Sequence, residues 1–149
     1  MNRRYPDRPF LGVGALIVDG QRILLCRRGK PPYVGQWSLP GGLVELGEPV
    51  VEALHREVRE ETGLEVSILR FFEVYERITG DKEGRTEYHF VLLDYLCRVE
   101  SGTLEAGDDA ADVRWFAAAE LASLEITPGS LPVIERALKT YEPLEPGPS

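Results

Sequence analysis

Three glutamates near the middle of the chain are spaced so that a helix would bring their carboxylates together. Glu57 and Glu61 are four residues apart and Glu57 and Glu60 are three apart, so their Cβ atoms would lie about 5–6 Å from one another on one side of a helix. Like charges at these spacings destabilise an exposed helix by about 0.2–0.5 kcal/mol per pair. A hard divalent cation with oxygen ligands removes that repulsion, and Mg²⁺ is the usual one where carboxylates and phosphates meet. The spacing therefore predicts a metal site.

The three acids also lie on the wrong side of the predicted helix for ordinary surface residues. With about 100° per residue from Pro49 to Thr62, the apolar residues define a buried stripe, which consists of Val50, Leu54, Val58 and Val51. Glu61 falls inside this stripe, and Glu57 and Glu60 fall at its border. The solvated side holds the other polar residues: His55, Arg59, Glu52 and Arg56. A charged surface helix held by Arg56–Glu60 pairing is the alternative, and it leaves the placement of the acids unexplained.

Glycine and proline flank this helix at positions that favour a ligand-binding loop. Pro49 suits the first helical position, where no amide donor is needed, and Gly63 suits the left-handed residue that ends a helix. Gly41 and Gly42 precede the helix, and residues without a Cβ let the backbone approach a ligand closely. The pattern predicts a loop, a helix and a loop arranged around the acids.

The complete pattern resembles the Nudix box. The chain has Gly42, five residues, Glu48, seven residues and then REVREETGL at positions 56–64. This matches every fixed position of G-x5-E-x7-R-E-U-x-E-E-x-G-U, where U is aliphatic, and the resemblance extends in element order from about Phe10 to Tyr141. It implies a Nudix hydrolase, which splits a diphosphate linkage in a nucleoside diphosphate joined to another group.

The resemblance also implies roles for individual residues. The metal-binding and catalytic carboxylates would be Glu57, Glu60 and Glu61, with the Gly41 carbonyl as a further metal ligand. The residues that brace the loop, helix and loop would be Gly42, Glu48, Arg56 and Gly63. Mg²⁺ is the expected cofactor, and Mn²⁺ can substitute for it.

Basic, aromatic and acidic residues outside the helix supply the remaining candidates. Arg27 and Arg28 end a predicted strand, so one of them should face the acidic helix; the resemblance favours Arg28 as a phosphate contact. Tyr33 is a candidate to stack on a base. Asp108 and Asp109 lie in a loop where family members place an acid that serves as a base or extra metal ligand. Solvated arginines and turn-forming acids are the alternatives.

Composition limits the partners. The net charge of −8 argues against nucleic acid, because the phosphate backbone attracts cationic proteins. The charge is nevertheless segregated, since residues 22–30 carry four basic side chains and no acid, whereas residues 42–65 carry seven glutamates and two arginines. This suits a small nucleotide held between a basic strand end and an acidic metal helix. No apolar run approaches 18 residues, so no membrane span is expected.

Cysteine and histidine usage points to a reducing compartment and away from zinc. Cys26 and Cys97 lie in apolar runs, and we expect them to be buried and unpaired in a cytoplasmic protein. The two histidines, His55 and His89, are too few and too far apart for a zinc site, and we interpret both as structural.

The element order predicts an α/β fold, the α/β/α sandwich around a mixed sheet that is the Nudix fold. We expect an N-terminal extension (1–9), one domain (10–141) and a disordered tail (142–149). The expected strands are 11–18, 21–27, 37–39, 64–75, 86–98 and 113–116; the expected turns and loops are 19–20, 78–85 and 101–111; and helices are expected from 49 to 62, from 118 to 121 and from 131 to 141.

The substrate is predicted less sharply than the reaction. The segment RRGKPPYVGQWSLPGG, residues 27–42, resembles small bacterial and archaeal members assigned to ADP-ribose, so we favour ADP-ribose or a related nucleotide sugar. The first alternative is a nucleoside triphosphate such as an oxidised guanine nucleotide. The second is a non-catalytic Nudix domain that senses a ligand, although such a domain should have an eroded box. The resemblance also allows a homodimer.

Overall fold

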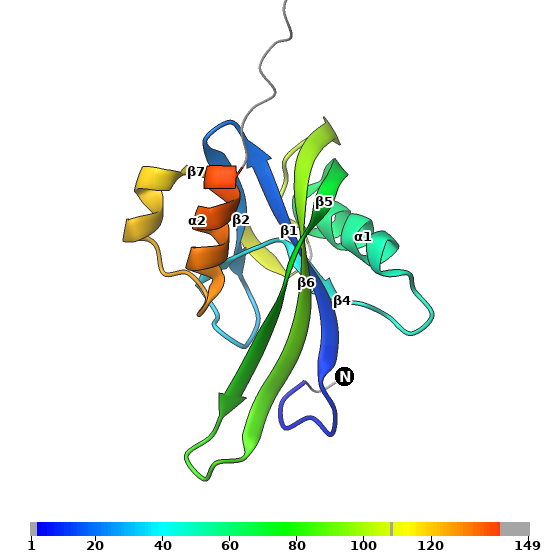
Figure 1. Cartoon of the computed structure of the whole chain (residues 1–149), viewed down its shortest axis with the longest axis vertical. Coiled ribbons are helices and arrows are strands. Elements are labelled where there is room, and N and C mark those ends of the chain that lie inside the picture. The colour runs from blue at the N-terminus through cyan, green and yellow to red at the C-terminus, as the bar shows by residue number, and fades with distance from the viewer. Residues whose placement is uncertain (1–2, 108, 141–149) are drawn as a thin grey trace, which may run out of the picture.

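The computed structural model describes residues 3–107 and 109–140. Figure 1 shows a twisted sheet with helices on both sides and a long hairpin that projects from it. The strands are β1 Phe10–Asp19, β2 Arg22–Arg28, β3 Trp37–Ser38, β4 Gly41–Leu43, β5 Leu64–Gly80, β6 Thr86–Gly102 and β7 Ala110–Ala117. The helices are α1 Val50–Thr62, the short 3-10 helix η1 Ala118–Ser123, and α2 Ser130–Thr140. None of the helices in these two ranges is long and apolar enough to cross a membrane.

Strand β1 joins the two halves of the sheet. It runs parallel to β6 from Phe10, opposite Phe90, to Ile17, opposite Cys97, and antiparallel to β4 and, at its end, to β2. Beyond these neighbours, β5 pairs with β6, while β3 and β7 pair with β2, all antiparallel. The predicted mixed sheet is therefore confirmed.

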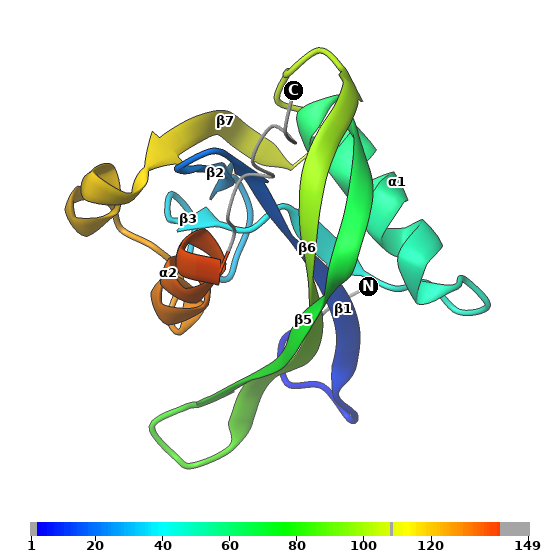
Figure 2. The ribbon, with the colours of Figure 1, turned by 45° about the horizontal axis from the view of Figure 1, so that its top comes forward.

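Alternation along β1 creates two separate cores. Val13, Ala15 and Ile17 pack beneath α1, whereas Leu16 and Val18 pack on the α2 side. Side chains of a strand point alternately to opposite faces, so one apolar strand serves both layers. Figure 2 shows α1 and α2 on opposite sides of the sheet, and the predicted α/β/α sandwich is confirmed.

The hairpin of β5 and β6 is longer than predicted. We expected a strand that ends at Tyr75 and a turn that begins at Ile78, and this is wrong because Ile78 pairs with His89 and the ladder continues to Gly80. The turn starts instead at Asp81, whose Oδ1 accepts the backbone N–H groups of residues 83 and 85, each at 2.9 Å. An aspartate whose side chain accepts hydrogen bonds from the following backbone N–H groups starts a turn. The position of this aspartate, and not that of the glycines, therefore sets where the hairpin turns.

Other boundaries also moved outward. β6 ends at Gly102 and not at Arg98, and β7 begins at Ala110 and not at Val113. The predicted loop at Pro40–Gly42 contains β4, which pairs with β1 through Gly41 and Gly14. Glycines weaken the sequence signal for a strand, but here they are needed, since a Cβ on Gly41 would lie 2.0 Å from the Val13 carbonyl oxygen. The predicted helix end at Tyr141 and the tail 142–149 lie outside the described residues.

Helix α1 ends at Thr62 as predicted but begins at Val50, one residue later than predicted, because Pro49 is its extended N-cap residue. Gly63 has φ 76° and donates its N–H to the Arg59 carbonyl at 3.0 Å, as predicted for a left-handed helix end. Val51 was expected in the core, yet it is 45% exposed, and Ala53 is fully buried instead. Val58 and Thr62 lie on the same side of the helix as Val51 and are fully buried, so Val51 is exposed because it lies in the first turn of α1.

Candidate active site

The acidic side of α1 faces a cavity of about 470 Å³ beside the ends of β2 and β4. Its acidic wall consists of Glu57, Glu60 and Glu61, and its basic wall consists of Arg3, Arg4, Arg27, Arg28 and Lys30. Cys26, Ser38, Leu39, Gly41 and Gly42 also line it. The charge segregation expected from the sequence therefore occurs within one cavity.

Glu61 is the most strained of the three acids. Its carboxylate accepts the Gly41 N–H at 3.4 Å and lies beside the Cys26 thiol. Burial, together with the neighbouring Glu57 carboxylate, raises the pKa of Glu61 to about 8. Burial also raises the pKa of Glu57. The desolvation and repulsion that the helical wheel predicted are both present, and a cation would relieve them.

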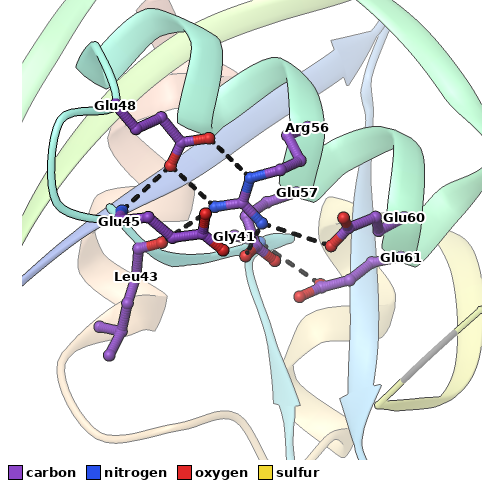
Figure 3. Close-up of polar contacts among 8 residues, drawn as sticks. All are labelled: Gly41, Leu43, Glu45, Glu48, Arg56, Glu57, Glu60 and Glu61. Carbon is purple, nitrogen blue, oxygen red and sulfur yellow. Dashed lines mark hydrogen bonds and ion pairs between the residues drawn. The ribbon is translucent and has the colours of Figure 1, made fainter.

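Arg56 holds the loop before α1 in place. Its guanidinium donates to Glu48 at 2.7 and 3.0 Å, to the Leu43 carbonyl at 3.1 Å and to Glu57 at 2.8 Å, and reaches Glu60 at 3.4 Å (Figure 3). The hydrogen bond from Arg56 lowers the pKa of Glu48 to about 2. The wheel placed Arg56 on the solvated side, and this is wrong because its side chain, only 23% exposed, turns back over the loop.

Gly42 is fixed by its contact with an acid. A Cβ built on Gly42 would lie 2.4 Å from the carboxylate carbon of Glu57. Because Arg56 holds Glu57 from the other side, the carboxylate has little freedom to move away. Only glycine fits between β4 and the helix without displacing this side chain.

The donor set fits a hard divalent cation. Three carboxylates lie on one cavity wall with Gly41 beside them, and Mg²⁺ prefers such oxygen ligands. Within the described residues, no three carboxylate, histidine or cysteine groups converge tightly enough to hold an ion as they lie. The Nη1 atom of Arg56 contacts Oε1 of Glu57 and Oε2 of Glu60, which leaves the second oxygen of each carboxylate available to a cation.

The residues predicted to contact substrate differ in how far they are buried in the cleft. Arg28 is partly buried and donates from Nε to the Pro32 carbonyl at 2.6 Å, whereas Arg27 is exposed at the rim and donates to the Gly35 carbonyl at 3.3 Å. Tyr33 is not among the described residues that line the two cavities, but the Arg77 guanidinium lies 5.5 Å from its ring centroid. One face of this ring is thus already covered by a cation.

The loop before β7 brings Asp109 to the cavity. The Gly29 N–H donates to the Asp109 carbonyl at 3.0 Å, which ties this loop to the end of β2. The Asp109 carboxylate pairs with Lys30 at 2.8 Å at the exposed rim. Asp108 lies outside the described residues, so its predicted role stays a prediction.

Comparison with known proteins identifies the family. The model of the NUDIX domain matches residues 8–137. The chain belongs to the Nudix family. An ADP-ribose pyrophosphatase of Methanocaldococcus jannaschii is 38% identical over 108 residues, which cover 72% of this chain but only 62% of that protein. A putative 8-oxo-dGTP diphosphatase of Mycobacterium tuberculosis is 38% identical over 119 residues, which cover 78% of this chain and 79% of that protein.

A solved relative agrees with the fold of this Nudix protein. The crystal structure of a MutT NUDIX hydrolase from Burkholderia pseudomallei superposes with a TM-score of 0.76 at 32% identity, covering 91% of this chain and all of that one. The predicted family, fold and enzyme class are confirmed. The predicted homodimer and the cytoplasmic location stay predictions.

Three residues of this Nudix cleft were missed from the sequence. A second cavity of about 100 Å³ adjoins the first, and Arg3, Arg77 and Asp94 line it. Asp94 is 3% exposed, its Oδ1 has no hydrogen-bond partner in the described structure, and burial raises its pKa to about 7. The sequence does mark Asp94, because an acid inside the apolar run LLDYLC predicts a buried carboxylate. Arg3 and Arg77 carry no comparable signal, because their approach depends on how the long hairpin folds.

Proposed function

We propose that the protein hydrolyses a diphosphate bond in a nucleoside diphosphate derivative, with ADP-ribose or a related nucleotide sugar as substrate. The observation that carries this proposal is one cavity with three carboxylates on one wall and Arg27, Arg28 and Lys30 on another. A diphosphate is negative along its whole length, so guanidinium groups can bind it directly while carboxylates can approach it only through a cation. The similarity to an archaeal ADP-ribose pyrophosphatase supports the choice of substrate.

In this proposal the residues of the box hold a divalent cation, Mg²⁺ with Mn²⁺ able to substitute. Its ligands are Glu57, Glu60, Glu61 and the Gly41 carbonyl. When bound, the cation offsets the phosphate charge and lowers the pKa of the attacking water. Arg28, partly buried and fixed through its Nε, orients the phosphate with its two terminal nitrogens.

The proton of the attacking water needs an acceptor. Glu60 is the most exposed of the three acids of α1, with a side chain 44% exposed, and it can reach a water in the cavity. Asp109 is the second candidate, and it must first leave Lys30. Tyr33 would stack on the base with the ring face that Arg77 does not cover.

An oxidised nucleoside triphosphate is the second candidate substrate. The relative from Mycobacterium tuberculosis, a putative 8-oxo-dGTP diphosphatase, matches this chain over similar shares of both proteins. Both substrates present a diphosphate to the same two walls, so they differ in what the rest of the cleft binds.

A substrate panel separates these possibilities. ADP-ribose, an ADP-sugar, 8-oxo-dGTP and dGTP are incubated with Mg²⁺ at several pH values, and products are identified by mass. We expect AMP and ribose 5-phosphate from ADP-ribose, with an alkaline optimum because the attacking water must lose a proton. Preferred cleavage of 8-oxo-dGTP would favour the second candidate. Binding of ADP-ribose without turnover of any compound would support the ligand-sensing alternative.

The metal requirement is tested with a matched pair of variants. Glu60→Gln should lower kcat by at least about a hundredfold, whereas Glu135→Gln, an exposed change on α2, should leave kcat within about twofold. Excess EDTA should abolish turnover by the wild-type protein. Full activity in EDTA would contradict the proposed mechanism.

A further inference from the structure

Three arginines gather where the two cavities of the cleft meet. Arg3 and Arg28 line both cavities, and Arg77 lines the smaller one. The cavities also share the wall formed by Ser38, Leu39, Gly41 and Gly42. The two cavities therefore form one continuous cleft, with the acids of α1 at one end and the arginine cluster, Arg3, Arg28 and Arg77, at the junction.

The arginine cluster makes no direct ion pair with any residue in the ranges 3–107 and 109–140, although the carboxylates of Glu61, Asp109 and Asp94 lie within electrostatic range of it. Burial lowers the pKa of Arg28, and the charges of Arg77 and Arg3 lower it further, so the three guanidiniums lie close enough to repel one another. The Nε of Arg77 is buried and has no hydrogen-bond partner among the described residues. Repelling cations with an unused buried donor favour a bound anion.

Arg77 is held rigidly in this position. It donates from Nη2 to the Pro128 carbonyl at 3.2 Å and to the Ser130 hydroxyl at 3.4 Å. Its guanidinium also lies 5.5 Å from the ring centroids of both Tyr33 and Tyr75. A guanidinium fixed by two rings and two oxygens loses little freedom when it binds a ligand.

Arg3 belongs to a short N-terminal segment, residues 3–5, which we call the strap. The strap lies along the projecting hairpin (Figure 2). The Tyr5 N–H donates to the Glu87 carbonyl at 2.7 Å, and the Tyr5 hydroxyl donates to Asp81 at 2.8 Å. Arg4 pairs with the Glu87 carboxylate at 2.7 Å. Tyr5 has φ 52°, a left-handed conformation that a non-glycine residue keeps only where contacts hold it. The strap is therefore fixed in the structure.

We infer that Arg3, Arg28 and Arg77 form a subsite for a phosphate group of a nucleotide, completed by the N-terminal strap. Its assignment to the substrate rests on the proposed function, but anion binding itself does not. The phosphate held here is one that the cation on α1 does not coordinate. The family match begins at residue 8, so Arg3 is a contribution of this chain beyond the matched domain.

Binding of inorganic pyrophosphate to the metal-free protein tests the subsite directly. In EDTA the acids of α1 cannot take part, so calorimetry reports pyrophosphate binding to the basic side chains of the cleft, and the variants show which of these side chains bind it. Arg3→Ala and Arg77→Lys should each weaken pyrophosphate binding at least about fivefold, because a guanidinium gives two parallel bonds to phosphate. Arg8→Ala is the matched control, since Arg8 is exposed, has Asp7 as its ion-pair partner among the described residues, and its replacement removes the same charge from the same segment.

The comparison with Arg8→Ala distinguishes a specific pyrophosphate site from a general attraction of pyrophosphate to positive charge. Equal weakening by Arg3→Ala and Arg8→Ala would overturn the subsite, as would pyrophosphate affinity within twofold of wild type in both Arg3→Ala and Arg77→Lys. Pyrophosphate binding that depends on Arg3 in a protein without ADP-ribose hydrolysis would leave the subsite standing and refute only the proposed function.

The role of the strap is tested by a double-mutant cycle. Tyr5→Phe removes the hydroxyl that bonds Asp81 and keeps the ring. This variant should weaken pyrophosphate binding about two- to threefold in the wild type, and it should have no effect in an Arg3→Ala background, because the strap acts through Arg3. In turnover assays both changes should raise KM and leave kcat within twofold. Additive effects of Tyr5→Phe and Arg3→Ala on binding would show that the strap does not act by placing Arg3.

Discussion

The Arg56 guanidinium donates two parallel hydrogen bonds, of 2.7 and 3.0 Å, to the Glu48 carboxylate across the loop that precedes α1. Glu48 also accepts the Glu45 N–H at 3.0 Å, and Arg56 reaches the Leu43 carbonyl. The pair therefore fixes both the backbone of the loop and the side of α1 on which the acids lie. Planar, two-pronged contacts of this kind are specific to arginine.

Replacement of Arg56 by lysine should damage the site despite conserving the charge. An ammonium cannot hold two oxygens of Glu48 and the Leu43 carbonyl together. We expect Arg56→Lys to lower kcat/KM by at least about tenfold and the free energy of unfolding by about 1–3 kcal/mol, the usual cost of buried charged donors and acceptors left unpaired. Urea unfolding and steady-state kinetics measure both. Activity within twofold of wild type would mean that the loop is held by other contacts.

Glu61→Gln should separate stability from function. The change keeps the volume and, above pH 8 where Glu61 is ionised, removes a desolvated charge beside Glu57, so at this pH the metal-free variant should be as stable as wild type or more stable. Catalysis should fall by orders of magnitude, and added Mg²⁺ should raise Tm less than in wild type. A large loss of metal-free stability with activity retained would show that Glu61 is a structural ion-pair partner.

The metal-free protein should lose stability as the pH rises. Folding raises the pKa of Asp94 to about 7 and that of Glu61 to about 8, whereas carboxyl groups in the unfolded chain titrate near pH 4. The folded state thus keeps protons that the unfolded chain has released, and the resulting stability is full below about pH 4 and is lost as the pH rises through 7 and 8.

Asp94→Asn isolates one of these two contributions. The variant keeps the shape of the side chain and removes its titration, so the fall in Tm between pH 5 and pH 8, measured in EDTA, should be smaller than in wild type. Asp112→Asn, at a partly exposed residue of β7 that pairs with Arg114, is the control and should leave the slope unchanged. An unaltered slope in Asp94→Asn would show that Asp94 is ionised throughout.

Gly42→Ala should lower activity more than stability. The added methyl group would meet the Glu57 carboxylate at about 2.4 Å, and overpacking of this kind costs about 1–3 kcal/mol. Because Glu57 must shift, we expect kcat to fall at least about tenfold. Gly80→Ala is the control, since its methyl group would have as its nearest neighbour the Arg85 carbonyl oxygen at 3.7 Å. Equal activity of the two variants would contradict the contact.

Local spacing predicted much of this molecule, and it failed where distant segments meet. The end of α1 at Thr62 and the left-handed Gly63 follow from neighbouring residues. The exposure of Val51 does not, because it depends on which distant residues reach the first turn of α1.

The same limit applies to the site. The box glutamates were predicted from their spacing, and the structure places them on one cavity wall. Arg3 and Arg77 are 74 positions apart, and only the fold of the β5–β6 hairpin and the strap brings them to one cleft. Their contribution had to be read from three-dimensional packing.

The position of the strap has a practical consequence for handling the protein. An affinity tag placed before Met1 would begin two residues from Arg3, which lines both cavities. A positively charged tag, such as oligohistidine at low pH, could itself bring cations to the cleft and change the apparent KM. Kinetic constants measured with the tag at the other end of the chain should therefore differ from those measured with a leading tag.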